Sequence, residues 1–211
     1  MHVKLSFDDA TVQDIEIAEL VAKYGFVKNT MFYFPVMPNV SNEIKGRRSL
    51  SPDQMQTIAN NFEIGSHTIS HRLLTRIPIG EAKSEIFDSR KILQEKYSQK
   101  IESFSYPRGY ANPDLQKLVQ DAGYTNARST LVGYVHESEN QFFEQTTVHA
   151  GNDRKEYGGK TWYEYALYML DVAEKTPNSV YHVWGHGYEL AAYPRGLLQL
   201  ESLLSEIKNR L

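Results

Sequence analysis

Short apolar runs alternate with amphipathic segments along the chain. Runs typical of buried strands lie at residues 2–7, 29–34, 62–65, 102–106, 124–127 and 180–184, and residues 142–148 form a further candidate strand. Helical spacing of apolar residues marks residues 12–24, 81–97, 113–122, 162–175 and 195–210, and Ser51 followed by Pro52 is typical of a helix start. Strands that alternate with helices predict crossover connections and a parallel sheet, either doubly wound or curled into a barrel.

Composition and charge exclude several classes of protein. None of the 211 residues is cysteine, which excludes disulfides, thiolate nucleophiles and cysteine-ligated metals. The formal net charge is −3 and no segment concentrates the basic residues, so we expect no nucleic-acid partner. No apolar run approaches the roughly 20 residues of a membrane span, and the start MHVKLSFDDA lacks the features of a signal peptide. We expect one domain over residues 1–211, a cytoplasmic location and no membrane partner; the sequence indicates no oligomeric state.

Two adjacent carboxylates, Asp8 and Asp9, follow the first predicted strand. In parallel α/β folds the chemistry lies at the carboxyl ends of the strands. Adjacent side chains of a strand face opposite sides, but a turn at this point would aim both carboxylates into one site. The structural alternative is that Asp9 or Thr11 caps the helix that begins near Val12.

A histidine pair, His67 and His71, follows the third predicted strand. Two histidines four residues apart lie on the same face of a helical turn, where neutral imidazoles can bind one divalent ion. The alternative is a pair that points into solvent or caps a helix. The pair alone does not decide between these interpretations.

A third histidine, His186, lies between Gly185 and Gly187 after the last predicted strand. Packing does not explain this position well, because the glycines remove bulk and allow unusual backbone angles. His182 precedes it by four residues and would lie deeper in the strand, where we expect a hydrogen-bonded core histidine.

These residues together predict metal-assisted hydrolysis. One carboxylate and two histidines form a common facial set of ligands for a divalent metal, and they leave positions open for water and substrate. The second carboxylate and the third histidine would then remain as a base and an acid.

Four motifs resemble those of the polysaccharide deacetylases, the NodB-homology family of carbohydrate esterases, in order over nearly the whole chain. SFDDA resembles the opening TFDDG motif, HTISH the H-(S/T)-x-x-H motif, FSYPRGYAN the arginine and proline motif, and HVWGHGYEL the final leucine and histidine motif. The resemblance implies an α/β fold, a distorted and incomplete (β/α) barrel of about seven strand–helix units, which agrees with the alternation of predicted elements.

The resemblance also implies a role for each matching residue. Asp8 would be the general base, His186 the general acid, and the ligands of one divalent metal, with zinc expected and other transition metals as alternatives, would be Asp9, His67 and His71. A backbone N–H near Arg108 would help the metal to hold the oxyanion. We assign substrate binding to Pro107, Arg108, Tyr110, Arg128 and Trp184. The implied reaction is hydrolysis of the amide of an N-acetylated or N-formylated amino sugar or related glycan.

The chain departs from the family pattern at three points. Ala10 stands where the family usually has glycine, and Ser105 stands where it usually has an arginine that pairs with the base. Arg128 or Arg154 is the candidate for the missing charge. The Asp-Trp motif that orients the general acid is not recognisable, and Asp153 or His149 is the candidate replacement.

Other functions remain open at this point. A non-catalytic carbohydrate-binding or assembly protein would keep the barrel and use Tyr106, Tyr110 and Trp184 to stack on sugar rings. The same machinery could hydrolyse a ring amide or an O-acetyl ester. Lys45, Arg47 and Arg48, between the second predicted strand and the next helix, would either meet an anionic substrate or only solvate the surface. A small intracellular substrate fits the absence of a visible export signal better than a cell-wall polymer.

Overall fold

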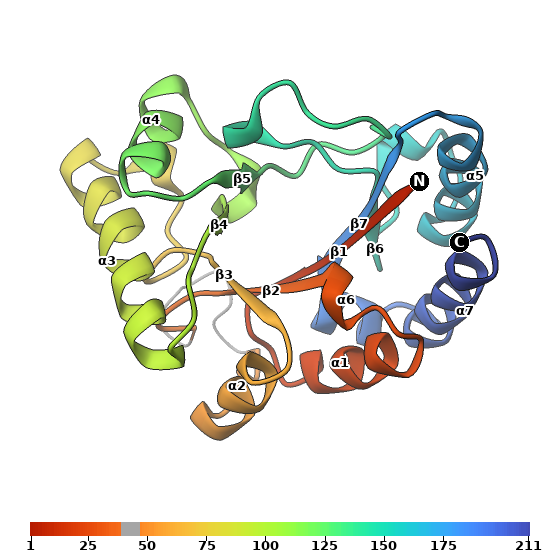
Figure 1. Ribbon diagram of the computed structural model, residues 1–211, viewed down its shortest axis with the longest axis horizontal. Helices are drawn as coiled ribbons and strands as arrows, with labels where there is room; N and C mark the ends of the chain where they lie inside the picture. Colours follow the sequence, from red (N-terminus) through yellow and green to blue (C-terminus); the bar gives the residue numbers. More distant parts are fainter. Residues whose placement is uncertain (39–46) are drawn as a thin grey trace.

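The computed structural model describes residues 1–38 and 47–211. Within these segments seven parallel strands form one sheet in the order β5-β4-β3-β2-β1-β7-β6. The strands are β1 (His2–Asp8), β2 (Thr30–Phe34), β3 (Glu63–Ser66), β4 (Ser103–Ser105), β5 (Asn126–Arg128), β6 (Val148–Ala150) and β7 (Val180–His186). The sheet curls into a partial barrel, and the connection between β5 and β6 crosses its open side (Figure 1). The expected incomplete barrel is confirmed.

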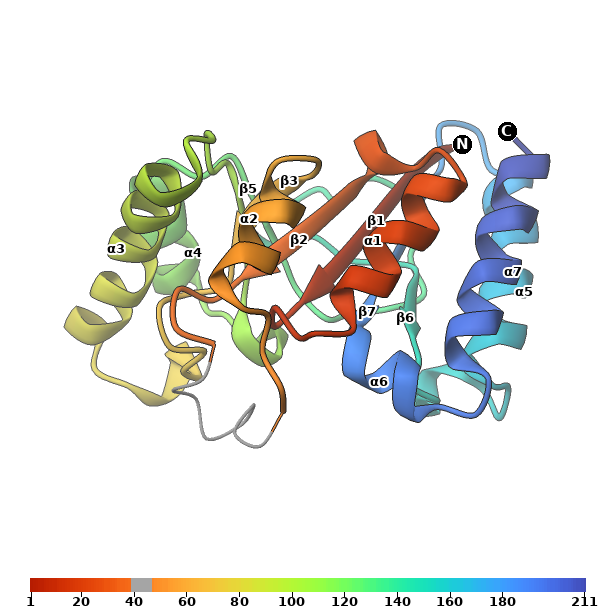
Figure 2. The same ribbon diagram turned by 90° about the horizontal axis from the view of Figure 1, so that it is seen from below.

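The helices cover the outside of the curled sheet. They are α1 (Asp14–Lys23), α2 (Pro52–Ala59), α3 (Ile79–Tyr97), α4 (Pro113–Asp121), α5 (Trp162–Lys175), α6 (Gly187–Ala192) and α7 (Gly196–Asn209). Helices α3 and α4 lie at the β4–β5 side, and α5 and α7 lie beside β6 and β7 (Figures 1 and 2). Both views place the two chain ends near one another, at the end of the sheet where β1 begins. In the described parts of the chain, no helix has the length and apolarity needed to cross a bilayer.

Alternation along the strands separates an apolar face of the sheet from a polar one. Phe7 of β1, Phe32 of β2 and Ile64 of β3 are level with one another in the parallel register, so they share one face, and all three are buried in the core. Ser6 and Asp8 alternate with Phe7 and therefore lie on the opposite face. The chain thus buries its apolar side chains on one face and lines the barrel interior with polar groups.

Two segments differ from the sequence expectation. The strand expected at residues 142–148 is a 3₁₀ turn at Gln141–Phe143, and β6 begins only at Val148. The side chain of Asn140 accepts a hydrogen bond from the N–H of Phe142, which favours the turn over an extended chain. Helix α6 was not expected, because six residues are too few to show a helical period.

Gly65 of β3 is required by close packing against the neighbouring strand. A Cβ atom at this position would lie 2.4 Å from two ring carbons of the buried Tyr33 and 3.1 Å from the Sδ atom of Met31. Gly65→Ala is therefore expected to lower the free energy of unfolding by about 1–3 kcal/mol, as measured by urea denaturation.

Gly80 provides the matched control for this substitution. It lies in the first turn of α3, and a Cβ atom there would have no other atom within 4 Å. Gly80→Ala should leave stability unchanged or raise it by up to about 1 kcal/mol, because alanine is the better helix former. Equal losses in both variants would show that Gly65 has no special packing role.

Candidate active site

The carboxyl ends of three strands bring the candidate residues together. Asp8 ends β1, His186 ends β7, and His67 directly follows β3. These ends surround a cavity of about 260 Å³, and its lining includes Asp8, Asp9, His67, His71, Trp184 and His186. The cavity lies at the end of the parallel sheet where such folds place their chemistry.

A left-handed turn aims both aspartates into the cavity. Asp9 and Ala10 have φ values of 80° and 53°, and this reversal brings the second carboxylate to the same side as the first. The helix-cap alternative is wrong, because the N-cap of α1 is Gln13 and makes no side-chain hydrogen bond. Ala10 keeps the left-handed conformation that glycine adopts more easily, at a cost of roughly 1–2 kcal/mol.

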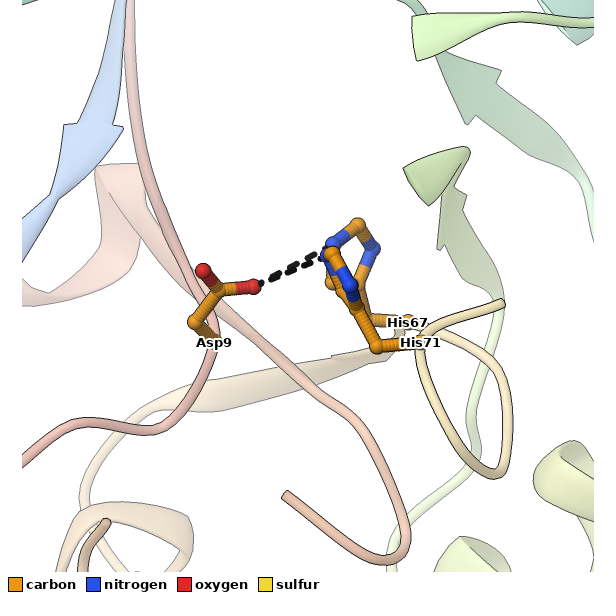
Figure 3. A group of neighbouring side chains, drawn as sticks. All are labelled: Asp9, His67 and His71. Carbon is orange, nitrogen blue, oxygen red and sulfur yellow. Dashed lines mark ion pairs between the residues drawn. The ribbon is translucent and has the colours of Figure 1, made fainter. Parts of the chain in front are cut away.

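The histidine pair is brought together by a turn rather than by the expected helical face. Thr68 and His71 have φ values of 70° and 55°, and the N–H of His71 donates to Oγ1 of Thr68 at 2.9 Å. The two imidazole centroids are 4.7 Å apart. The Nε2 atoms of His67 and His71 lie 3.5 and 3.2 Å from Oδ1 of Asp9 (Figure 3). All three side chains are buried.

The protonation states of this cluster suit a divalent metal. The Nδ1 atom of His67 lies 2.7 Å from the carbonyl oxygen of Ser105, so Nδ1–H donates there and Nε2 keeps its lone pair toward Asp9. Burial lowers the pKa of His67 to about 4, which keeps the ring neutral. Burial raises the pKa of Asp9, but the nearby His186, His71 and His67 outweigh this effect and hold it below its usual range. The Oδ1 atom of Asp9 is buried and faces the Nε2 atoms of both histidines. One ionised carboxylate oxygen and the imidazole nitrogens fit the set of metal ligands predicted from the sequence.

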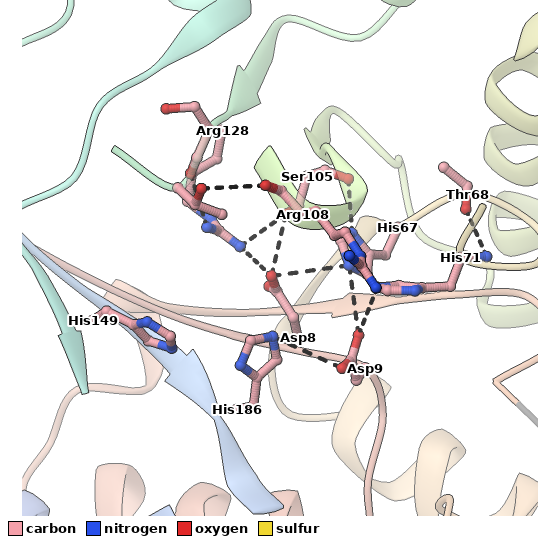
Figure 4. A network of polar contacts seen from close by, with 12 residues as sticks. Asp8, Asp9, His67, Thr68, His71, Ser105, Arg108, Arg128, His149 and His186 are labelled. Atoms are coloured by element: carbon pink, nitrogen blue, oxygen red, sulfur yellow. Dashed lines mark hydrogen bonds and ion pairs between the residues drawn. The ribbon is translucent and has the colours of Figure 1, made fainter. Parts of the chain in front are cut away.

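Asp8 forms a buried ion pair with Arg128. The Nη2 group of Arg128 contacts Oδ2 of Asp8 and also donates to Oγ of Ser105 at 2.8 Å, and Ser105 donates to the same carboxylate oxygen at 3.3 Å (Figure 4). Burial raises the pKa of Asp8, but the Arg128 guanidinium and the neighbouring histidines outweigh this effect. The pKa is therefore below its usual value and the carboxylate is ionised. Arg154, the other candidate for this charge, pairs with Glu156 and donates to the carbonyl of Thr130.

Glu189 holds His186, and sequence reasoning missed it. The Oε2 atom of Glu189 lies 2.6 Å from Nδ1 of His186 and 2.7 Å from Nε2 of His149. Burial lowers the pKa of His186, but Asp9 and Glu189 outweigh it and raise the pKa to about 9. Asp153 does not replace the Asp-Trp motif, because it bonds Trp162 and Tyr193 instead. The His-x-x-Glu spacing at the first turn of a helix was the signal available in the sequence.

Comparison with known proteins places this chain in a family. The sequence model of polysaccharide deacetylases matches residues 1–127. The chain belongs to the polysaccharide deacetylase family. YxkH of Bacillus subtilis (strain 168), provisionally named a polysaccharide deacetylase, is 29% identical over 132 residues, which are 62% of this chain. The chain covers only 45% of the length of YxkH.

Solved structures share the fold at low sequence identity. A protein of Mycobacterium smegmatis, provisionally described as a polysaccharide deacetylase, superposes with a TM-score of 0.71 at 12% identity, over 98% of this chain and 83% of that chain. A CE4 family pseudoenzyme of Bacillus anthracis superposes with a TM-score of 0.65 at 15% identity, over 99% of this chain and 61% of that chain. The deacetylase fold therefore occurs both in proteins described as deacetylases and in a pseudoenzyme.

In this deacetylase-family chain the predicted substrate-binding residues lie in different places. Arg108 and Trp184 line the cavity, and Arg128 lies behind Asp8. Pro107 is buried and Tyr110 is exposed, and neither lines the cavity. Tyr106 is not available for stacking on sugars, because it is buried and its hydroxyl donates to the carbonyl of Phe142. Lys45 lies outside the described residues.

The ion pair between Arg128 and Asp8 predicts a large effect on stability. Arg128→Met would leave the carboxylate of Asp8 buried without its countercharge, so we expect the free energy of unfolding to fall by about 3–5 kcal/mol. The measurement is denaturant unfolding near pH 7. Adding Asp8→Asn to Arg128→Met should restore more than half of the loss, because the unpaired charge is then removed.

Arg154→Met is the control, because its ion pair with Glu156 is partly exposed. The free energy of unfolding of this variant should fall by less than about 1 kcal/mol. An Arg128→Met variant as stable as this control would refute the importance of the buried pair.

Proposed function

We propose that this chain is a divalent-metal-dependent N-deacylase that hydrolyses the amide of an N-acetylated or N-formylated amino sugar or related glycan. One observation carries the proposal: the buried Asp9, His67 and His71 cluster shares a cavity with an ionised Asp8 on one side and His186 on the other. Membership of the deacetylase family supports a hydrolase. The substrate and the acyl group are part of the proposal.

The ligands of the metal would be Oδ1 of Asp9 and imidazole nitrogens of His67 and His71, and zinc is the expected ion. The bound ion would polarise the amide carbonyl and lower the pKa of a water molecule. The buried Oδ1 of Asp9, which faces both imidazoles, and the neutral ring of His67 support this assignment.

Asp8 is placed to act as the general base. Arg128 and Ser105 hold its Oδ2 atom, whereas its Oδ1 atom is buried and has no hydrogen-bond partner in the described segments. Oδ1 can therefore accept the proton of the attacking water, whose oxygen forms the new bond to the acyl carbon. Arg128 fixes the orientation of the carboxylate and keeps it ionised.

His186 is placed to act as the general acid. Glu189 holds the Nδ1 side of the ring, and Nε2 lies 3.8 Å from Oδ2 of Asp9, so Nε2 faces the cluster. The Nε2 proton would pass to the departing nitrogen as the C–N bond breaks, which gives a free amine and a small carboxylic acid. A backbone N–H near Arg108 would help to hold the oxyanion.

The alternative of carbohydrate binding without catalysis is supported by the pseudoenzyme that shares the fold. Trp184 lines the cavity, but it is buried and its ring stacks on His149, so it is not open for stacking on a sugar. The alternative does not explain why an unpartnered carboxylate oxygen and a histidine held by Glu189 face the same cluster. A binding module needs neither a base nor an acid.

Substitutions at the cluster separate metal binding from catalysis. Asp9→Ala and His71→Ala should abolish both bound metal and amide hydrolysis, whereas Asp8→Asn should keep the metal and lose at least about 10²-fold in kcat, because only the base is removed. Metal content is measured by mass spectrometry and activity by amine release from N-acetylated and N-formylated amino sugars.

The exposed His136 provides the control, because His136→Ala should keep both metal and activity. Purified wild-type protein that binds no divalent metal after reconstitution would refute the mechanism. Full activity in Asp8→Asn would refute the assignment of the base.

Glu189 is expected to act as a positioning residue for His186. Glu189→Gln should lower kcat by about 10–10² fold and leave KM and metal content nearly unchanged, because the substituted amide holds Nδ1 of His186 without a negative charge. Steady-state kinetics and metal analysis give the measurement. Glu95→Gln, at an exposed carboxylate of α3, is the control. A rise in KM with unchanged kcat would contradict the positioning role.

A further inference from the structure

Three arginines that the amide chemistry does not require line the cavity. Arg47 precedes α2, Arg108 lies in the 3₁₀ turn Pro107–Gly109, and Arg154 lies between β6 and α5. They come from separate parts of the chain and meet around the same opening as Asp8 and Asp9. A neutral sugar amide gives no reason for this concentration of positive charge.

The charge balance of the cavity changes when a cation binds. Several charged side chains of the described residues line the cavity or pair with a residue that lines it. Four of them are arginines and four are carboxylates. The arginines are Arg47, Arg108, Arg128 and Arg154, and the carboxylates are Asp8, Asp9, Glu156 and Glu189. The divalent cation of the proposed function would add two positive charges to this lining, beside the proton that His186 carries as the acid, in a chain whose formal net charge is −3. A cavity of this sign attracts anions.

Arg47 is held in place by an aromatic ring beside the cluster. Its guanidinium carbon lies 3.5 Å from the centroid of the Tyr188 ring, and its Nη1 atom lies 3.4 Å from Oδ2 of Asp9. About a third of the side chain remains exposed, at 35%. A guanidinium has five N–H donors, so these contacts leave donors for a ligand.

Arg154 is held on the cavity wall in a comparable way. Its Nη1 donates to the carbonyl of Thr130 at 3.1 Å, and its Nη2 lies 3.4 Å from Glu156. The side chain is 22% exposed. Both arginines are thus partly desolvated and oriented, and planar guanidinium groups of this kind bind phosphate and carboxylate through paired hydrogen bonds.

We propose that the substrate carries an anionic group, a phosphate or a carboxylate, that Arg47 and Arg154 bind while the acylated nitrogen faces the Asp9 cluster. This inference rests on the proposed deacylase function and narrows its substrate class to anionic N-acyl amino sugars. Arg47 and Arg154 would then determine specificity, and Asp8 and His186 would carry out the chemistry.

Matched sugars test the inference. The probes are N-acetylglucosamine, its 1-phosphate and 6-phosphate, and N-acetylmuramic acid as the carboxylate. At least one anionic probe should exceed the neutral sugar about 10-fold or more in kcat/KM, and this advantage should fall as salt rises from low to high concentration. The phosphate and carboxylate probes distinguish the two sources of anionic charge.

Arginine variants locate the effect. Arg47→Gln and Arg154→Gln should each reduce the ratio of kcat/KM for the anionic and neutral probes by about 10-fold, mainly through KM for the anionic probe. Arg48→Gln is the control, because Arg48 neighbours Arg47 in sequence but is exposed and does not line the cavity. Equal turnover of neutral and anionic probes would overturn the inference and leave the deacylase function intact.

A binding measurement separates the failure of this inference from failure of the deacylase function. Calorimetry with the same probes is run on metal-loaded wild type and arginine variants of equal metal content. Preferential binding of an anionic probe that weakens in both arginine variants supports the inference even without turnover. Binding of anionic probes no tighter than that of N-acetylglucosamine overturns it, as does tight binding that the variants leave unchanged.

Discussion

The ion pair between Asp8 and Arg128 joins two strands that lie far apart in the sheet. In the strand order, β4, β3 and β2 separate β5 from β1, so a contact between Arg128 and Asp8 requires the sheet to curl. Ser105 of β4 bridges the two side chains, and the guanidinium carbon lies 5.3 Å and 4.7 Å from the ring centroids of Tyr33 and Trp184. A buried charge is costly unless it is paired and hydrogen-bonded, so this single contact couples the curvature of the barrel to the ionisation of the proposed base.

The need to pair a buried charge also explains why the charged partners of Asp8 and His186 stand at other positions than the family pattern implies. The arginine usual at the position of Ser105 is replaced by Arg128, which reaches Asp8 from the neighbouring strand β5. At His186 the carboxylate comes from Glu189, which lies in the helix after β7. Electrostatic effects depend on distance and burial and not on position in the sequence. A charge can therefore come from another element and still act on the proposed base or the proposed acid.

The sequence predicted the alternation of elements and the residues of the cluster, because apolar periods and paired His and Asp residues are visible in a linear pattern. It did not predict the turns that assemble them. Asp9, Ala10, Thr68 and His71 adopt positive φ values, and none of these residues is a glycine that would signal such a turn. The choice of Arg128 over Arg154 depends on the curl of the sheet, and Glu189 lies in a helix too short to show a period. The turns and the choice of Arg128 arise from tertiary contacts and leave no local signal, whereas Glu189 leaves only the His-x-x-Glu spacing.

The polar interior of the barrel sets the charge that the site presents. Burying Asp8, Asp9 and Arg128 costs desolvation energy, and near balance between arginines and carboxylates reduces that cost in the metal-free protein. A divalent ion bound at the Asp9 cluster, as we propose, would add positive charge beside these arginines. The protein cannot move these charges away, since Arg128 is fully buried and Arg47 is stacked on Tyr188. Under the proposed function, a negatively charged substrate would offset the charge that the ion adds. The arginines that stabilise the metal-free barrel would then also favour anionic substrates in the metal-loaded protein.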